Sequence, residues 1–89
     1  MEKTILLNVG RNNFVSSARI LSITTWESAA VKKIVQHAKE NNLIINTTCG
    51  KKTRSVIFMD TGNIVLSSVQ PETLAARFIN PKNYGNENG

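Results

Sequence analysis

The most distinctive chemistry in this sequence is the short basic segment Gly50-Lys51-Lys52-Thr53-Arg54. Three cationic side chains fall within four residues, and no acidic residue is nearer to them than Asp60. Glycine permits a sharp turn, and neighbouring lysines in a turn project into solvent, where they can reach phosphate oxygens. The segment therefore indicates contact with a polyanion, although a solvated hairpin tip would show the same pattern.

Two arginines extend this hypothesis to other parts of the chain. Arg19 opens an expected strand beside Ser16 and Ser17, whose hydroxyls could donate to phosphate, but it could equally pair with an acid such as Glu27. Arg11 is the basic residue of an expected turn. The candidate nucleic-acid-binding residues are therefore Arg19, Lys51, Lys52, Arg54 and Arg11.

Signatures of catalysis and of metal binding are missing from the sequence. It contains no GxGxxG, P-loop, HExxH or CxxC motif. Asp60 and Glu72 come nearest to a carboxylate pair, but Asp60 suits a hairpin turn and Glu72 the start of a helix. The single histidine, His37, and the single cysteine, Cys49, make no convincing metal site. We expect no enzymatic activity, no cofactor, no metal and no small-molecule substrate.

Size and charge favour a basic, self-associating protein. The chain has 89 residues, with 11 Lys and Arg against 6 Asp and Glu, which gives a net charge of +5. A domain this small buries only a marginal core of its own, so self-association would stabilise it. One cysteine indicates a reducing compartment, and the sequence shows neither a signal peptide nor an apolar run of membrane-spanning length. We expect a cytoplasmic protein with no membrane partner.

Hydrophobic patterning predicts five strands, at residues 4–9, 19–23, 43–48, 54–60 and 64–69. Residues 14–17 are ambiguous. In the second strand, Leu21 and Ile23 should share one face and Ile20 and Ser22 the other. Turns are expected at residues 11–13, 49–53 and 60–63.

Two helices are expected between and after these strands. The long one should begin after Thr24 or Thr25 as N-cap, carry Glu27 in its first turn and run to about Asn41. A short helix should run from Pro71 to about Phe78. The apolar stripe of the long helix comprises Ala30, Val31, Ile34, Val35 and Ala38.

The resulting order, ββαβββα, predicts an α+β fold: a small, mostly antiparallel five-stranded sheet with one long and one short helix. The last three strands are close enough along the chain to form a meander. One domain should cover residues 1–79, and residues 80–89 should be a disordered polar tail. Because the long helix has strands on both sides, a helix-turn-helix is absent, and strands and turns would have to contact nucleic acid.

Several segments of the chain resemble one protein family. In the N-terminal half these are Asn8-Val9-Gly10, Val15-Ser16, Arg19-Ile20-Leu21-Ser22-Ile23 and Glu27-Ser28-Ala29. In the C-terminal half they are residues 53–60 and the run from Ile64 to Thr73, which includes Ser67-Ser68-Val69-Gln70-Pro71-Glu72-Thr73. Over residues 3–78 the chain resembles the RemA family, the extracellular matrix regulatory protein A family of bacteria.

The resemblance implies a transcriptional regulator of biofilm-matrix genes. It implies ring-shaped homo-oligomers that bind double-stranded DNA along the outer rim, and a fold similar to LytTR-type DNA-binding domains. The resemblance also implies that Arg19, Lys51, Lys52 and Arg54 match DNA-binding positions of the family.

Three positions depart from the family pattern. A basic pair that is usually Arg-Arg is Lys51-Lys52 here, which keeps the charge but loses the bidentate guanidinium fork. Trp26 and Ala30 stand near the helix start, where the family often has prolines, and Trp26 could serve either a subunit contact or the core. Cys49 stands where an aromatic residue is common. These departures concern the regulated genes more than the fold.

Other functions remain open on the sequence. An oligomeric scaffold whose basic rim binds an acidic protein would need no nucleic acid. RNA binding is a variant of the first hypothesis, but it usually brings exposed aromatic residues for stacking, and the chain has only five aromatic residues. A small enzyme would need convergent catalytic groups that the sequence does not show.

Overall fold

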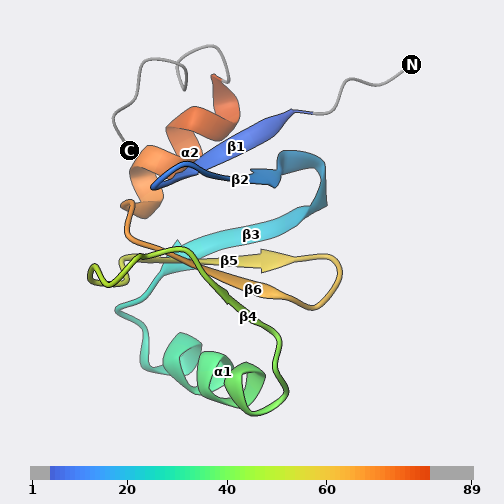
Figure 1. Cartoon of the computed structure of the whole chain (residues 1–89), viewed down its shortest axis with the longest axis vertical. Coiled ribbons are helices and arrows are strands. Elements are labelled where there is room, and N and C mark those ends of the chain that lie inside the picture. Colours follow the sequence, from blue (N-terminus) through green and yellow to red (C-terminus); the bar gives the residue numbers. More distant parts are fainter. Residues whose placement is uncertain (1–4, 81–89) are drawn as a thin grey trace.

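A computed structural model describes residues 5–80 of the chain (Figure 1). They form two β-sheets, two α-helices and a short 3-10 helix. The strands are β1 (Leu6–Gly10), β2 (Asn13–Ser16), β3 (Ile20–Thr25), β4 (Ile44–Asn46), β5 (Ser55–Met59) and β6 (Ile64–Ser67). The helices are η1 (Ser17–Arg19), α1 (Ala29–Glu40) and α2 (Pro71–Ile79). The α+β class is confirmed.

The larger sheet has four strands in the order β3-β5-β6-β4. Its β3–β5 and β5–β6 pairs are antiparallel, whereas β4 runs parallel to β6. Because side chains alternate along a strand, β5 sends Val56 and Phe58 to one face and Ile57 and Met59 to the other. Both faces of this sheet are therefore apolar and need covering.

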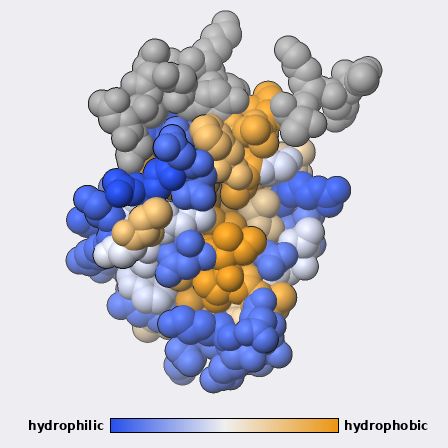
Figure 2. Space-filling model, in the orientation of Figure 1, coloured by the Kyte–Doolittle hydropathy of each residue, from blue (hydrophilic) through white to orange (hydrophobic). Residues whose placement is uncertain are grey.

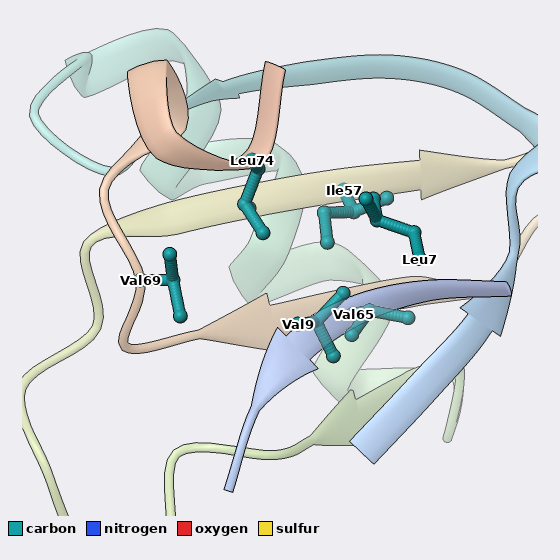
Figure 3. Packing of buried hydrophobic residues seen from close by; sticks show 6 residues of the cluster. All are labelled: Leu7, Val9, Ile57, Val65, Val69 and Leu74. Carbon is teal, nitrogen blue, oxygen red and sulfur yellow. The ribbon is translucent and has the colours of Figure 1, made fainter. Parts of the chain in front are cut away.

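Each face of the larger sheet carries its own hydrophobic cluster. Helix α1 covers one face and buries Val31, Val35 and Ala38 against Val56, Ile64 and Leu66. The β1–β2 hairpin and α2 lie over the opposite face (Figure 1). The second cluster joins β1, β5, β6 and α2 and comprises Leu7, Val9, Ile57, Val65, Val69 and Leu74 (Figure 3). The fold is thus a three-layer arrangement with the four-stranded sheet in the middle.

The predicted single five-stranded sheet is wrong. The ambiguous segment forms β2, which pairs only with β1, so these two strands make a separate two-stranded sheet. The predicted meander of the last three strands is also wrong, because β4 pairs with β6 rather than with β5. After β4 the chain must therefore cross the end of β6 before it enters β5, and residues 47–54 (the β4–β5 loop) make that crossing.

The predicted faces of the second strand are corrected by a β-bulge. The register of β3 against β5 shifts between Ile20 and Ser22. An extra residue at that point breaks the alternation, so Ile20 and Ile23 both pack on the core while Leu21 is 70% exposed.

The start of α1 also differs from the prediction. Thr24 and Thr25 belong to β3, where Thr25 pairs with Ser55, and they cannot cap the helix. The N-cap is Ser28, whose hydroxyl accepts a hydrogen bond from the amide of Val31 at 3.3 Å. Glu27 precedes the helix, and no acidic residue occupies its first turn. The buried stripe is narrower than predicted, since Ala30 and Ile34 are exposed.

The remaining elements follow the predictions closely. Helix α2 begins at Pro71, and the β5–β6 hairpin turns through residues 60–63. Trp26 is half-buried and packs against the α1 cluster, which favours its core role. The tail predicted for residues 80–89 lies outside the described residues, apart from Asn80, which ends α2. The predicted beginning of the first strand at residue 4 lies outside them as well.

Candidate functional site

Four of the five predicted cations line a single depression on the surface. Arg11, Lys51, Lys52 and Arg54 surround it together with Ser68, and its volume is about 330 Å³. We call this depression the basic groove. Its lining comes from three separate segments of the chain and includes no Asp or Glu within the described range 5–80.

The topology explains why these segments meet. The β1–β2 turn and the β4–β5 loop both lie at the left of Figure 1, where β6 ends and the chain leads on to α2. Because the β4–β5 loop crosses the end of β6, its basic residues come next to Ser68, the residue directly after that strand. The surface at this side is mostly hydrophilic in the same orientation (Figure 2).

The β4–β5 loop is fixed to β6 at both of its ends. The amide and the hydroxyl of Thr47 donate to the Leu66 carbonyl at 3.0 and 2.7 Å, and the Arg54 amide donates to the Ser67 carbonyl at 2.8 Å. Between these anchors, the Lys51 amide donates to the carbonyl of Thr48 at 2.9 Å and closes a tight turn. The loop therefore has a defined conformation in spite of its exposed lysines.

Positive backbone φ angles shape this turn. Cys49 has φ 53° and Gly50 has φ 84°. Positive φ at both central residues defines a type I′ turn, and glycine suits the second position because it lacks a Cβ. The sequence signal for a turn at this glycine is thereby confirmed.

The β1–β2 turn has the same left-handed character. Arg11 has φ 55° and Asn12 has φ 64°. The Asn13 side-chain amide donates to the carbonyls of Gly10 and Arg11 at 3.2 and 3.1 Å, and the Gly10 amide donates to the Asn8 side-chain oxygen at 2.8 Å. These local hydrogen bonds hold the turn that presents Arg11 to the basic groove.

Two buried hydroxyls join the elements beneath the groove. Ser67 donates to the Val9 carbonyl at 2.7 Å and accepts from the Val69 amide at 3.0 Å. Ser55 donates to the Val69 carbonyl. Both serines are fully buried, and each satisfies backbone groups that would otherwise lose their water partners. The end of β1, the start of β5 and the end of β6 are therefore linked below the two basic turns.

Sequence reasoning missed these serines and Ser68 as parts of the site. The available signal was the Ser67-Ser68 pair at the end of an otherwise apolar strand, and Ser55 at the start of the strand before it. A hydroxyl inside an apolar strand usually bonds to backbone, but the pattern does not say to which segment.

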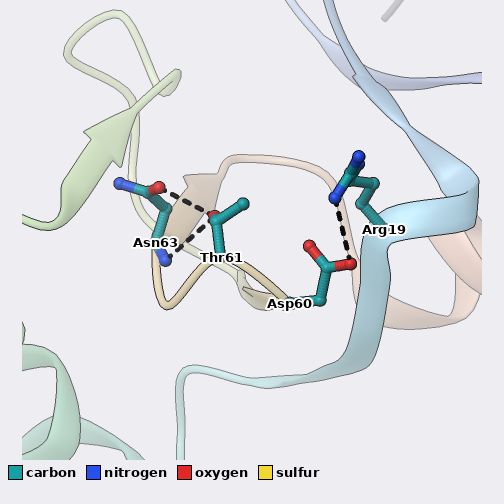
Figure 4. A network of polar contacts seen from close by, with 4 residues as sticks. All are labelled: Arg19, Asp60, Thr61 and Asn63. Carbon is teal, nitrogen blue, oxygen red and sulfur yellow. Dashed lines mark hydrogen bonds and ion pairs between the residues drawn. The ribbon is translucent and has the colours of Figure 1, made fainter.

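Arg19 lies apart from the basic groove. Its guanidinium forms an ion pair with Asp60 at 3.4 Å, and their side chains are 62% and 39% exposed (Figure 4). The Asp60 amide also donates to the Arg19 carbonyl at 2.8 Å. With a strand rise of about 3.3 Å per residue, residues 54 and 60 are about 20 Å apart along β5. The acid that pairs with Arg19 is Asp60 rather than Glu27.

The hydroxyl beside Arg19 is occupied as well. Ser17 donates its side-chain proton to the Ile5 carbonyl at 2.9 Å. The Ser17 hydroxyl therefore holds the backbone at Ile5, and its proton is already donated rather than available to a phosphate. The two ends of β5 thus differ: Arg54 faces other cations, and Arg19 faces a carboxylate.

Other chemistry is sparse in residues 5–80. They contain no group of three or more His, Cys, Asp or Glu side chains that could hold a metal ion. Cys49 is exposed at its turn, and His37 lies within 3.4 Å of the Asn41 side chain on α1. Neither α1 nor α2 is long and apolar enough to cross a membrane.

Comparisons with known proteins find one matching family and a set of similar sequences. The model of the RemA-like family, described as extracellular matrix regulatory protein A-like, matches residues 6–78. Proteins of Bacillus cytotoxicus, Bacillus mycoides and Bacillus cereus are each 48% identical to this chain over 81 residues. These alignments cover 91% of this chain and 93% of each relative, and each relative is named a candidate regulatory protein. The names point to regulation rather than to catalysis.

Proposed function

Because the chain belongs to the RemA-like family, we propose that it is a DNA-binding transcription regulator of extracellular-matrix and biofilm genes. It acts in the cytoplasm as a ring-shaped homo-oligomer. The observation that carries this proposal is the basic groove, in which Arg11, Lys51, Lys52 and Arg54 share one depression whose lining has no acid.

The binding mode is electrostatic and uses turns. Lysine and arginine side chains that neutralise phosphates release condensed counterions, and each neutralised phosphate contributes roughly −0.9 to the slope of log K against log salt. Helices α1 and α2 lie on opposite faces of the sheet, so they cannot form a helix-turn-helix. The proposed contact therefore comes from the β1–β2 turn and the β4–β5 loop, which is consistent with the use of strands and turns expected from the sequence.

Assembly supplies the affinity that one subunit lacks. A few phosphate contacts bind weakly, whereas several subunits in one ring raise the effective concentration of each further contact. The described residues offer an apolar surface for such assembly beside the open edge of β3. Its groove of about 250 Å³ is lined by residues that include Leu21, Phe78 and Ile79, which are 70%, 43% and 73% exposed. Large exposed apolar patches of this kind mark interaction sites.

The test is a charge-matched pair of double variants. Lys51→Ala/Lys52→Ala removes two cations from the basic groove, and Lys33→Ala/Lys39→Ala removes two exposed cations from α1. Fluorescence anisotropy with a labelled duplex at two salt concentrations should show binding lost in the first variant and retained in the second. Light scattering should give the same oligomeric mass for both. Unchanged binding by the first variant, or a stable monomer in the wild type, would contradict the proposal.

The same groove would also fit an acidic protein partner, because carboxylates and phosphates attract the same cations. A scaffold of that kind would show no duplex binding at low salt. A pull-down that captures an acidic protein while the duplex titration stays flat would favour this second function.

A further inference from the structure

We infer that the basic groove is a preformed binding site for one phosphate group, with Arg11 on one side and the residues of the β4–β5 loop on the other. This inference deepens the proposed DNA-binding function and rests on it for the biological ligand. The ligand is a phosphate group, which the DNA backbone or a small phosphorylated anion can equally supply.

The donor set fits a phosphate group. The groove offers two guanidinium groups, from Arg11 and Arg54, two ammonium groups, from Lys51 and Lys52, and the Ser68 hydroxyl. Guanidinium binds phosphate oxygens in pairs, whereas ammonium acts as a compact point charge. An anion with three or four acceptor oxygens can accept from several of these donors and can match the paired N–H groups of a guanidinium, whereas a spherical chloride ion has no pair of oxygens to do so.

The two sides of this phosphate-binding site are held in place before any ligand binds. The Ser67 hydroxyl joins β6 to the Val9 carbonyl, one residue before Gly10, from which the β1–β2 turn leaves β1. The Arg54 amide bonds to the Ser67 carbonyl, so the same residue also anchors the β4–β5 loop. Because the backbone of both turns is already fixed, binding orders side chains only, which lowers its entropic cost.

The conformation of Arg11 supports a role in binding. A left-handed backbone costs a non-glycine residue roughly 1–2 kcal/mol, and asparagine tolerates it better than arginine. Arg11 nevertheless occupies this conformation at φ 55°, in a turn whose next residue is Asn12. An arginine at a position that asparagine suits better indicates that its side chain is used.

Arg11→Asn is therefore the variant that separates charge from folding. It removes the guanidinium but keeps a residue type that suits the turn. Lys39→Ala is the matched control, since it removes one exposed cation from α1, outside the groove lining. Thermal unfolding should show both variants folded, with Arg11→Asn at least as stable as the wild type.

The experiment is a titration of the full chain with pyrophosphate, monitored through the backbone amide signals in NMR spectra. Sodium chloride keeps the ionic strength constant during the titration. In the wild type, amides at residues 10–12, 49–54 and 68 should shift and saturate. Loss of a charge-assisted hydrogen-bond pair should weaken this binding about tenfold in Arg11→Asn. Lys39→Ala should stay within about twofold of the wild type, as expected for a solvated surface charge.

A shift that never saturates, or equal weakening by both variants, would overturn the inference in favour of diffuse electrostatic attraction. A parallel duplex titration separates this result from the proposed function. If the duplex binds but pyrophosphate neither saturates the groove nor competes with the duplex, the inferred phosphate site is wrong and the proposed DNA binding stands. If pyrophosphate saturates the groove while the duplex does not bind, the proposed DNA binding is wrong and the inferred phosphate site stands.

Discussion

The two ends of strand β5 carry similar residues but different electrostatics. At the Arg54 end, four cations meet around the basic groove, and its lining within the described residues has no carboxylate. At the opposite end, Arg19 is paired with Asp60 at 3.4 Å (Figure 4). The first end combines the β1–β2 turn with the β4–β5 loop, and the second combines the start of β3 with the β5–β6 turn. The electrostatic character of each end is therefore set by which side chains the fold brings together, and not only by how many cations the chain contains.

The support beneath the two ends differs as well. The groove end rests on Ser55 and Ser67, which are fully buried and bonded to backbone groups of other segments. The turn at the Asp60 end has contacts within itself, such as the Thr61 hydroxyl donating to the Asn63 side-chain oxygen at 2.8 Å, and its bonds to other segments come from the Asp60 amide and the half-buried Asn63 side chain. The groove end is therefore joined to other segments through fully buried hydroxyls, whereas no fully buried side chain in the described part of the chain makes the corresponding bonds at the Asp60 end.

Placing a carboxylate in the groove should make the first end resemble the second. Ser68→Asp adds a negative charge among the four cations, where it would pair with them and repel phosphate. Like-charge contacts at an interface cost several kcal/mol, so DNA affinity should fall by roughly 100-fold. Anisotropy titration at low salt measures the loss.

Ser68→Ala is the control for that variant, because it removes the hydroxyl without adding charge. Its affinity should drop only severalfold, as expected for one neutral hydrogen bond. If Ser68→Asp bound DNA as well as Ser68→Ala, the basic groove would not be the contact surface.

Removing a buried hydroxyl should break the support that distinguishes the groove end. Ser67→Ala leaves the Val9 carbonyl and the Val69 amide without their bonded hydroxyl. The loss of buried hydrogen bonds should cost about 2 kcal/mol, which lowers Tm by roughly 10 °C for a domain of this size. Thermal unfolding followed by circular dichroism measures the shift.

Thr61→Ala provides the comparison at the other end of β5. Its exposed hydroxyl contacts only the neighbouring Asn63 side chain and amide, so Tm should change by no more than about 2 °C. Equal shifts in the two variants would show that the groove end has no special support.

The same contrast explains how much the sequence could predict. Lys51, Lys52 and Arg54 were identifiable because they are neighbours in the chain and follow a turn glycine. Their meeting with Arg11 could not be predicted, since it depends on how the β1–β2 hairpin packs against β5 and β6, which follow much later in the chain. The α1 and α2 stretches were predicted from periodicity and proline placement.

The errors in the predicted strand pairing and in the predicted faces of β3 have a related cause. The short strand β4 carries no signal that it runs parallel to β6, yet this pairing sends the β4–β5 loop across the end of β6. Likewise, the alternation of β3 could not reveal the bulge that exposes Leu21. Local patterns specify elements, whereas pairing partners are decided by the total apolar surface that the assembled layers bury.

The smallest expected effect concerns the paired end of β5. Asp60→Asn removes the carboxylate that neutralises Arg19 and keeps a side chain of similar shape. Freed from its partner, Arg19 can contact a phosphate, so DNA affinity should rise about twofold to fivefold and the salt slope should steepen by roughly 0.9. Stability should change by less than about 1 kcal/mol, because exposed ion pairs contribute little. In an Arg19→Ala background the same substitution should leave affinity unchanged, and a gain that persisted there would mean that Asp60 acts through the general field of the protein rather than through Arg19.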